Sequence, residues 1–333
     1  MCLYTHTHDV LYSVMDPKSQ LYARSQIAAL TSIDASSLNY WSREGLLVAS
    51  AGGGGQGSHR RFDFVQVNIA AIFGQLRRFG LNIGALRSLA DVLQAAARLG
   101  ASHDLHPSNY LTAAHIASAL HRFRSGNPVL IPAHSISEER PDGLYGMAYS
   151  DWLMAKRPAK NEDEVIDHLT GNSNEYDPRE SVIAAAEGIG PGQETCARIY
   201  ADLVYDILAP GYSGGYSWLL ALDDDGTWRI AFGEGAKFFD TILSEDPEEF
   251  GAGLFLPVAG VIRKVWKLKT PDEHRRERDE EFIRSKLSAA GITGTVTISA
   301  DEDENFLIEA PEAKEGAIEA ALSGTRFAIR SKA

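Results

Sequence analysis

Residues 25–62 constrain the fold more than any other part of this chain. Residues 25–30 form a short predicted helix with apolar side chains on one face, and the next three residues interrupt it. Asp34 then stands where a carboxylate accepts backbone N–H groups at the start of a second helix. Leu38 and Trp41 lie three positions apart on that helix, so we expect both to face inward. Two short helices joined by so tight a turn predict a helix-turn-helix.

The opposite side of the second predicted helix is polar. Its hydroxyl, amide and guanidinium groups can donate hydrogen bonds to phosphates and to the edges of bases. This side of the helix is therefore suited to a groove of duplex DNA. The side chains expected on it are those of Ser36, Ser37, Asn39, Tyr40 and Arg43.

A glycine-rich loop follows the helix pair. Residues 46–48 start an extended stretch, and residues 51–58 contain too much glycine for regular structure. An ordered path resumes at residues 59–62, so we expect the loop to be the tip of a two-stranded wing. Glycines leave room for a phosphate backbone at this tip, and Arg60 and Arg61 supply the opposite charge.

Two further helices are predicted after the wing. Asp63 is placed to cap a helix that ends near Phe79, and Asn82 is placed to cap the next one. His106 and Pro107 then interrupt the helical pattern, because proline disfavours helical geometry in the residue before it.

Three blocks of this segment, residues 38–47, 59–62 and 76–83, resemble the DNA-binding domain of the MerR family of bacterial transcription regulators. The resemblance implies a winged helix-turn-helix whose second helix enters the major groove while the wing contacts the flanking backbone. The positions that match the contacts of the family are Ser36, Ser37, Asn39, Tyr40, Trp41 and Arg43 on the helix, and Arg60 and Arg61 on the wing.

The chain departs from the family pattern at several positions. The family usually has a glycine where Ser32 stands, an arginine at Asn39 and a glutamate at Ser42. Its dimers are commonly joined by a long antiparallel helix after the fourth helix, which Gly100 and Pro107 interrupt here. We still expect a homodimer, without assigning its interface.

Charge is distributed unevenly along the chain. Residues 17–100 hold nine Lys and Arg against four Asp and Glu, so they carry +5 of a total of −13, and the other parts carry −18. A basic N-terminal segment on an acidic body fits a protein that places one end on DNA.

The sequence contains no apolar run of about 18 residues, so we expect a cytoplasmic protein without membrane association. The two cysteines, Cys2 and Cys196, predict neither a disulfide nor a thiolate metal site.

The length of 333 residues predicts more than one domain, and the mixture of patterns predicts an α+β fold. Residues 1–18 are expected to be a flexible tail and residues 19–100 the winged helix-turn-helix. Residues 101–141 are expected to contain a connecting helix and a linker. An α+β effector or interaction domain is predicted at residues 142–270, and a small α-β-β-α-β subdomain at residues 271–333.

Within the predicted effector domain, residues 181–188 and 194–208 have helical patterns, as do residues 109–124 before it. Residues 218–222 and 228–232 flank an acidic turn with a glycine, which predicts a β-hairpin.

The function of this body is left open by the sequence. Aromatic residues around the hairpin suit a small organic effector, but such residues also commonly form cross-strand core pairs. A second interpretation is contact with RNA polymerase or another protein, and a third is an enzymatic module delivered to DNA. We find no nucleophile motif, phosphate-binding loop or zinc spacing, so we predict no enzyme, cofactor or metal. The candidate effector-binding residues are Tyr212, Tyr216, Trp218 and Trp228.

Overall fold

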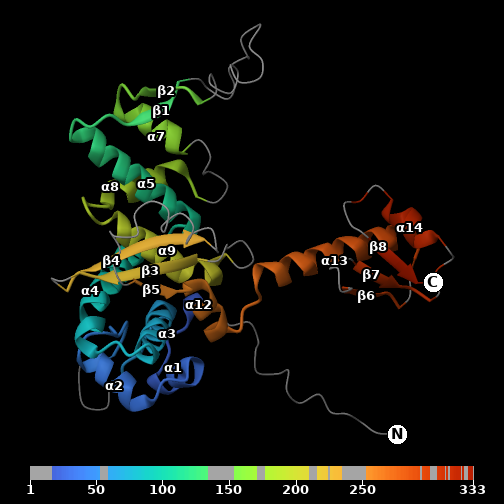
Figure 1. Cartoon of the computed structure of the whole chain (residues 1–333), viewed down its shortest axis with the longest axis horizontal. Helices are drawn as coiled ribbons and strands as arrows, with labels where there is room; N and C mark the ends of the chain where they lie inside the picture. Colours follow the sequence, from blue (N-terminus) through green and yellow to red (C-terminus); the bar gives the residue numbers. More distant parts are fainter. Residues whose placement is uncertain are drawn as a thin grey trace. The chain divides into compact units, whose positions relative to one another are not determined.

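The computed structural model divides into two compact units, Met1–Leu268 and Lys269–Ala333, and has an α+β fold (Figure 1). The residues that it describes are 17–52, 59–133, 154–170, 177–209, 216–223, 226–234, 253–292, 295–300, 306–311, 313, 316–323, 325 and 329–332. Most of the predicted tail and the tip of the predicted wing therefore lie outside the described residues.

The first unit consists mainly of helices. These are η1 (Pro17–Ser19), α1 (Arg24–Thr31), α2 (Ala35–Arg43), α3 (Phe64–Arg78), α4 (Ile83–Ala101), α5 (Pro107–Arg124), α7 (Glu162–Thr170), α8 (Arg179–Gly188), α9 (Glu194–Leu208) and α12 (Val258–Trp266). Its strands are β1 (Leu130–Pro132), β2 (Lys156–Pro158), β3 (Tyr216–Leu222), β4 (Trp228–Glu234) and β5 (Gly253–Leu256).

Polar residues start the helices where the sequence predicts them. The Asp63 carboxylate accepts the backbone N–H of Gln66 at 2.9 Å at the start of α3, and Asn82 accepts that of Ala85 at 2.9 Å at the start of α4. Helix α5 begins at Pro107, whose fixed φ suits the first turn. The predicted caps and the predicted interruption between α4 and α5 are thus confirmed.

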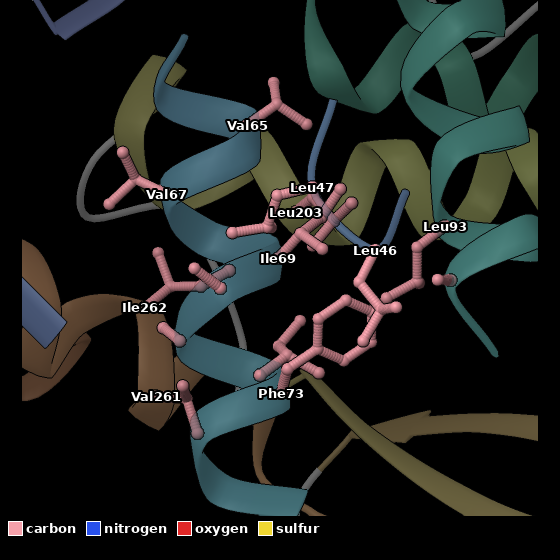
Figure 2. Packing of buried hydrophobic residues seen from close by; sticks show 14 of the residues in the cluster. Leu46, Leu47, Val65, Val67, Ile69, Phe73, Leu93, Leu203, Val261 and Ile262 are labelled. Atoms are coloured by element: carbon pink, nitrogen blue, oxygen red, sulfur yellow. The ribbon is translucent and has the colours of Figure 1, made fainter. Parts of the chain in front are cut away.

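The largest hydrophobic core joins the N-terminal helices to later parts of the chain. Apolar side chains of α1 to α4 pack with those of α9, β3, β5 and α12. Figure 2 shows Ile262 of α12 near Val67 of α3, with Val261 alongside a later turn of the same helix. The sequence suggested separate domains at residues 19–100 and 142–270, whereas their apolar faces share one core. The boundaries predicted within this unit therefore stay predictions.

A buried amide links three helices of this core. Asn68 of α3 is fully buried, and its Nδ2 donates to the carbonyl of Leu203 in α9 at 2.7 Å. Its Oδ1 accepts the indole N–H of Trp266 in α12 at 2.6 Å. Because both polar ends of this amide are satisfied, it fixes the position of α3 between α9 and α12.

A second core lies between α5, α7, α8 and part of α9. Strands β1 and β2 pair antiparallel beside it, with Ile131 opposite Arg157. The sequence did not predict these strands or α7, and it predicted a linker at residues 132–141. Pro132 instead belongs to β1, where it pairs with Lys156. The other residues of that predicted linker, from 134 onwards, lie outside the described residues.

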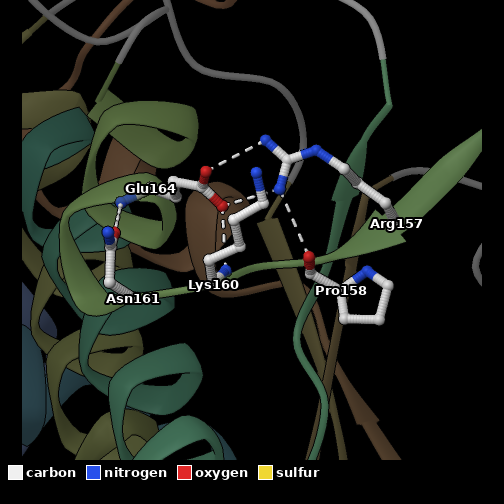
Figure 3. A network of polar contacts seen from close by, with 5 residues as sticks. All are labelled: Arg157, Pro158, Lys160, Asn161 and Glu164. Carbon is white, nitrogen blue, oxygen red and sulfur yellow. Dashed lines mark hydrogen bonds and ion pairs between the residues drawn. The ribbon is translucent and has the colours of Figure 1, made fainter.

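An ion pair and hydrogen bonds stabilise the connection between β2 and α7 (Figure 3). Arg157 donates from both terminal nitrogens to the carboxylate of Glu164, at 2.6 and 3.1 Å. The same carboxylate accepts the backbone N–H of Lys160 at 2.9 Å, and Asn161 caps the helix by accepting the backbone N–H of Glu164. The Arg157 hydrogen bond and then the Lys160 N–H lower the pKa of Glu164 to about 2.

The three-stranded sheet of the first unit has the order β4-β3-β5 and is antiparallel. Leu222 of β3 pairs with Trp228 of β4, which confirms the predicted hairpin. Residues 224 and 225 of its turn lie outside the described residues. Residues 253–266 form β5 followed by α12.

The second unit has the predicted α-β-β-α-β order. Its elements are α13 (Pro271–Ala289), β6 (Thr297–Ala300), β7 (Phe306–Glu309), α14 (Ala317–Leu322) and β8 (Ile329–Lys332). Strand β7 pairs antiparallel with β6 and parallel with β8. A separate core forms between Ile283, Leu287, Ile308, Ile318 and Leu322. Among the described helices of both units, none has the length and apolar character needed to cross a membrane.

Candidate nucleic-acid interface

Asp34 fixes the start of α2. Its carboxylate accepts the backbone N–H of Ser37 at 2.8 Å and the Ser37 hydroxyl at 2.7 Å, and it also accepts the Ser36 hydroxyl. The Ser36 hydroxyl and then the Ser37 groups hold the pKa of Asp34 well below its usual range. An ionised carboxylate at this position stabilises the helix, because the N-terminal end carries partial positive charge.

The outer face of α2 is formed by residues spaced as neighbours on a helix surface. Ser36, Asn39, Tyr40 and Arg43 are all exposed, and the Tyr40 side chain is 41% exposed despite its aromatic ring. The Arg43 guanidinium has no hydrogen-bond or ion-pair partner among the described residues. Ser37 is half-buried and engaged with Asp34. The structure therefore brings together four of the six helix residues expected to contact DNA.

Trp41 lies on the inner side of α2. Its side chain is 3% exposed, and its ring packs edge-on against Phe73 of α3 at a centroid distance of 6.1 Å. Leu38 is fully buried on the same side. The inward direction predicted from the spacing of these two residues is confirmed. Because a buried ring cannot reach a groove, the contact surface that we propose below does not include Trp41.

The two arms of the wing pair with each other at their base, and the second arm also pairs with the chain before α1. The backbone N–H of Arg61 donates to the Ala51 carbonyl at 2.8 Å, and the Ser50 N–H donates to the Arg61 carbonyl at 2.8 Å. The next residue, Phe62, exchanges two backbone hydrogen bonds with Tyr22, at 2.7 and 3.0 Å. The wing is thus anchored to the chain that precedes α1.

Two buried glutamines anchor the first arm of the wing. The Gln66 and Gln94 amides exchange hydrogen bonds at 2.8 and 2.9 Å. Gln94 also donates to the Leu46 carbonyl, and Gln66 accepts the Val48 N–H, both at 2.9 Å. Because α3 and α4 supply these two amides, they determine where the arm leaves the core.

The two adjacent arginines of the wing have different environments. Arg60 is half-buried, and its Nη1 donates to the carbonyl and the hydroxyl of Ser42 at 2.8 and 2.7 Å. It thereby ties the wing to the last turn of α2, where carbonyl groups favour a cation. Arg61 is exposed and has no side-chain partner among the described residues. Arg60 therefore positions the wing, and Arg61 is available to an external anion.

Arg24 lies in the same region, although it was not among the residues predicted to contact DNA. This first residue of α1 donates a hydrogen bond from Nη1 to Oδ1 of Asn39 on α2. It also lines a cavity of about 290 Å³ together with Arg60, Arg61 and His59. Arg24 reaches this position because of the angle between α1 and α2. No local sequence pattern predicts that angle.

Of the aromatic residues expected to bind an effector, Trp218 belongs to the core of the first unit. Trp218 is fully buried, donates from Nε1 to Asp202 at 2.8 Å, and packs edge-on against its strand partner Phe232. This arrangement favours the cross-strand core pair that the sequence left open as the alternative.

The other members of that aromatic set are dispersed. Tyr216 is buried and lies against Tyr205 of α9, whereas the indole N–H of Trp228 donates to the Ala85 carbonyl of α4 at 2.9 Å. Tyr212 lies outside the described residues. In the part of the chain that the structure describes, no three His, Cys, Asp or Glu side chains are grouped as a metal site requires.

A comparison with known families agrees with this geometry. Residues 22–93 match the family described as MerR HTH family regulatory protein. No curated protein matches the chain. The match begins at Tyr22, which pairs with the wing, and ends at Leu93 in α4. Residues 22–93 are therefore a MerR-type helix-turn-helix domain, the DNA-binding part of a transcription regulator.

Proposed function

We propose that this protein is a sequence-specific transcription regulator in which the outer face of α2 contacts bases in the major groove. One observation carries the proposal: Ser36, Asn39, Tyr40 and Arg43 share the exposed side of a capped helix whose other side is buried. Amide and guanidinium groups pair with purine edges, and hydroxyl groups serve either bases or phosphates.

The cationic cavity beside α1 is the proposed site of a backbone phosphate. Arg24 and Arg61 supply positive charge, and the first N–H groups of α1 point to the N-terminal end of the helix. Arg60 acts through Ser42 by holding the wing against α2. Phosphate contacts of this kind set the register of α2 in the groove and supply binding that is independent of sequence.

The experiment that tests this proposal is a salt titration of duplex binding with the full chain. The duplexes are one selected from random DNA by the protein and one scrambled duplex of the same length. Arg61→Ala should weaken binding to both, and the slope of log K against log salt should fall by about one for the lost phosphate contact. Arg122→Ala, at an exposed arginine of α5 outside the matched domain, is the control and should leave the slope unchanged.

Asn39→Ala gives the complementary result in the same assay. It should reduce the preference for the selected duplex by about 1–3 kcal/mol while changing binding to the scrambled duplex much less. An unchanged slope in Arg61→Ala together with unchanged preference in Asn39→Ala would refute the proposed surface.

We further propose that the rest of the chain regulates this domain through an effector or a protein partner. The shared core supports this proposal, because α9 and α12 pack directly on α3 of the DNA-binding domain. The other interpretation, a catalytic body delivered to DNA, has no sequence motif in its favour. RNA polymerase and a second copy of the chain are the predicted partners. Light scattering, with a footprint of two half-sites about one helical turn apart, would demonstrate the homodimer.

A further inference from the structure

A second cavity lies between the helix-turn-helix and α12. Its volume is about 520 Å³, within the range of sites that hold small organic molecules. The turn between α1 and α2 forms one wall, the C-terminal half of α3 forms the second, and α12 forms the third. Figure 2 shows how closely α12 approaches α3, with Val261 between the two helices. The cavity therefore lies between the DNA-binding domain and the body that we propose to regulate it.

The charge around this cavity is predominantly positive. Arg77 and Arg78 line it from α3, and Lys264 and Lys267 line it from the region of α12. Arg77 donates to the Leu81 carbonyl at 2.6 Å, so it is already engaged in ending α3. Arg78 and Lys264 are exposed and have no side-chain partner among the described residues. Two cations are therefore available to a bound molecule.

The carboxylate on the rim does not neutralise these cations. Asp34 lines the cavity, but its oxygens accept the hydroxyls of Ser36 and Ser37 and the Ser37 N–H. It forms no ion pair of 4.0 Å or less with a described cation. An anionic group would thus meet a net positive surface between α3 and α12, where charge-assisted hydrogen bonds to guanidinium and ammonium groups are strong.

The rest of the lining is largely apolar. Ile33 of the α1–α2 turn is half-buried and lines the cavity, and the largely buried Trp41 and Val265 line it from α2 and α12. Gly74 of α3 allows this arrangement, since a Cβ at that position would lie 2.9 Å from Cδ1 of Ile33. A ligand of this cavity consequently needs an apolar body as well as a negative charge. A duplex backbone has the charge but no apolar body, so the lining favours a small molecule over DNA.

We propose that this cavity binds a small organic anion, with an apolar body against Ile33 and Val265 and a carboxylate or phosphate between Arg78 and Lys264. Such a ligand would contact the α1–α2 turn and α12 simultaneously. Its binding would therefore stabilise one position of α12 against the helix-turn-helix. Any effect on DNA affinity rests on the proposed function, whereas the binding itself is measured without DNA.

Isothermal titration of the full chain with naphthalene-1-carboxylate tests the proposal. The uncharged naphthalene-1-carboxamide is the matched ligand, since it keeps the apolar body and removes the charge. We expect the carboxylate to bind about tenfold or more tightly than the amide, as the loss of charge-assisted hydrogen bonds implies. Arg78→Gln combined with Lys264→Gln should weaken carboxylate binding by a similar factor, because both side chains are exposed and the fold does not depend on them.

Arg122→Gln combined with Lys160→Gln removes two exposed cations elsewhere and should leave the affinity unchanged. Absence of carboxylate binding at millimolar concentration, or equal affinity for the amide, would overturn the proposal. So would unchanged affinity in the Arg78→Gln, Lys264→Gln variant. A parallel titration with duplex DNA separates the two anions: if that variant loses only DNA binding, the cations serve the duplex and not a small ligand.

Discussion

Ser32 has an unusual backbone conformation at the centre of the DNA-binding domain. It ends α1 with φ 58° and ψ 28°, in the left-handed region, and its N–H donates to the Ala28 carbonyl. A residue with a Cβ pays about 1–2 kcal/mol for this conformation. The MerR family that this segment resembles usually has glycine here, but a left-handed turn was not predicted from this departure.

Replacement of this residue should relieve the strain. Ser32→Gly is expected to raise the free energy of unfolding by up to about 1 kcal/mol, reduced by the greater freedom of glycine in the unfolded chain. Urea unfolding followed by circular dichroism measures the change. Ser125→Gly at the end of α5, where φ is −81°, is the control and should bring no gain. Equal gains in both variants would show that the left-handed conformation costs nothing at Ser32.

The roles of single residues were predictable where their partners are close in sequence. Asp34, Asp63 and Asn82 each cap a helix through a backbone N–H three residues later, so a local pattern is enough. The role of Asn68 depends on Leu203 and Trp266, which are 135 and 198 positions away. Partners so distant in the sequence cannot be predicted from a local pattern. Arg24 was missed for the same reason.

At the scale of elements, the approach of α4 to α9 depends on a single glycine. A Cβ at Gly100 would lie 2.2 Å from ring carbons of Tyr200. That ring cannot withdraw easily, because it packs against Tyr110 of α5 at a centroid distance of 4.9 Å. The absence of a side chain at Gly100 therefore permits three helices to meet.

Gly100→Ala should consequently destabilise the protein, although alanine favours helices. Overpacking against Tyr200 is expected to cost about 1–3 kcal/mol, more than the gain of about 1 kcal/mol in helix propensity. Thermal unfolding compares this variant with Gly260→Ala in α12, where the nearest atom is Pro257 Cβ at 3.9 Å. The Gly260 variant should be stabilised by about 0.5–1 kcal/mol. A stabilised Gly100 variant would contradict the tight contact.

Elements with a long periodic pattern were predictable, and short ones were not. Helix α9 was expected at residues 194–208 and occupies these residues, because its apolar positions recur over four turns. Strands β1 and β2 have three residues each, too few for an alternating pattern. The cavity between α3 and α12 was also beyond prediction, since it is assembled from segments far apart in the chain.

At the scale of the whole molecule, the two units differ in which segments form their hydrophobic cores. The DNA-binding helices share their core with α9 and α12, whereas residues 269–333 have a core of their own. The family match covers residues 22–93. Segments outside this range help to bury the apolar side chains of the match, so the folded unit is larger than the matched segment.

Two truncations should show which segments each core needs in order to be stable. Removal of residues 269–333 should leave the unfolding temperature of the first unit within about 2 °C, because its core is intact. A fragment of residues 1–100 lacks Leu203, Val261 and Ile262, which cover α3 in the intact chain, and should not unfold cooperatively. Calorimetry measures both. A fragment that melts sharply at the temperature of the full chain would show that the shared core contributes little.

The amide of Asn68 finally has a consequence for biosynthesis. Its indole partner is made 198 residues later, so at a translation rate of about 5–20 residues per second it emerges about 10–40 s after Asn68. During this interval the apolar side of α3 has no α12 to cover it. The nascent polypeptide is thus expected to complete the core around α3 only after residue 266 has left the exit tunnel.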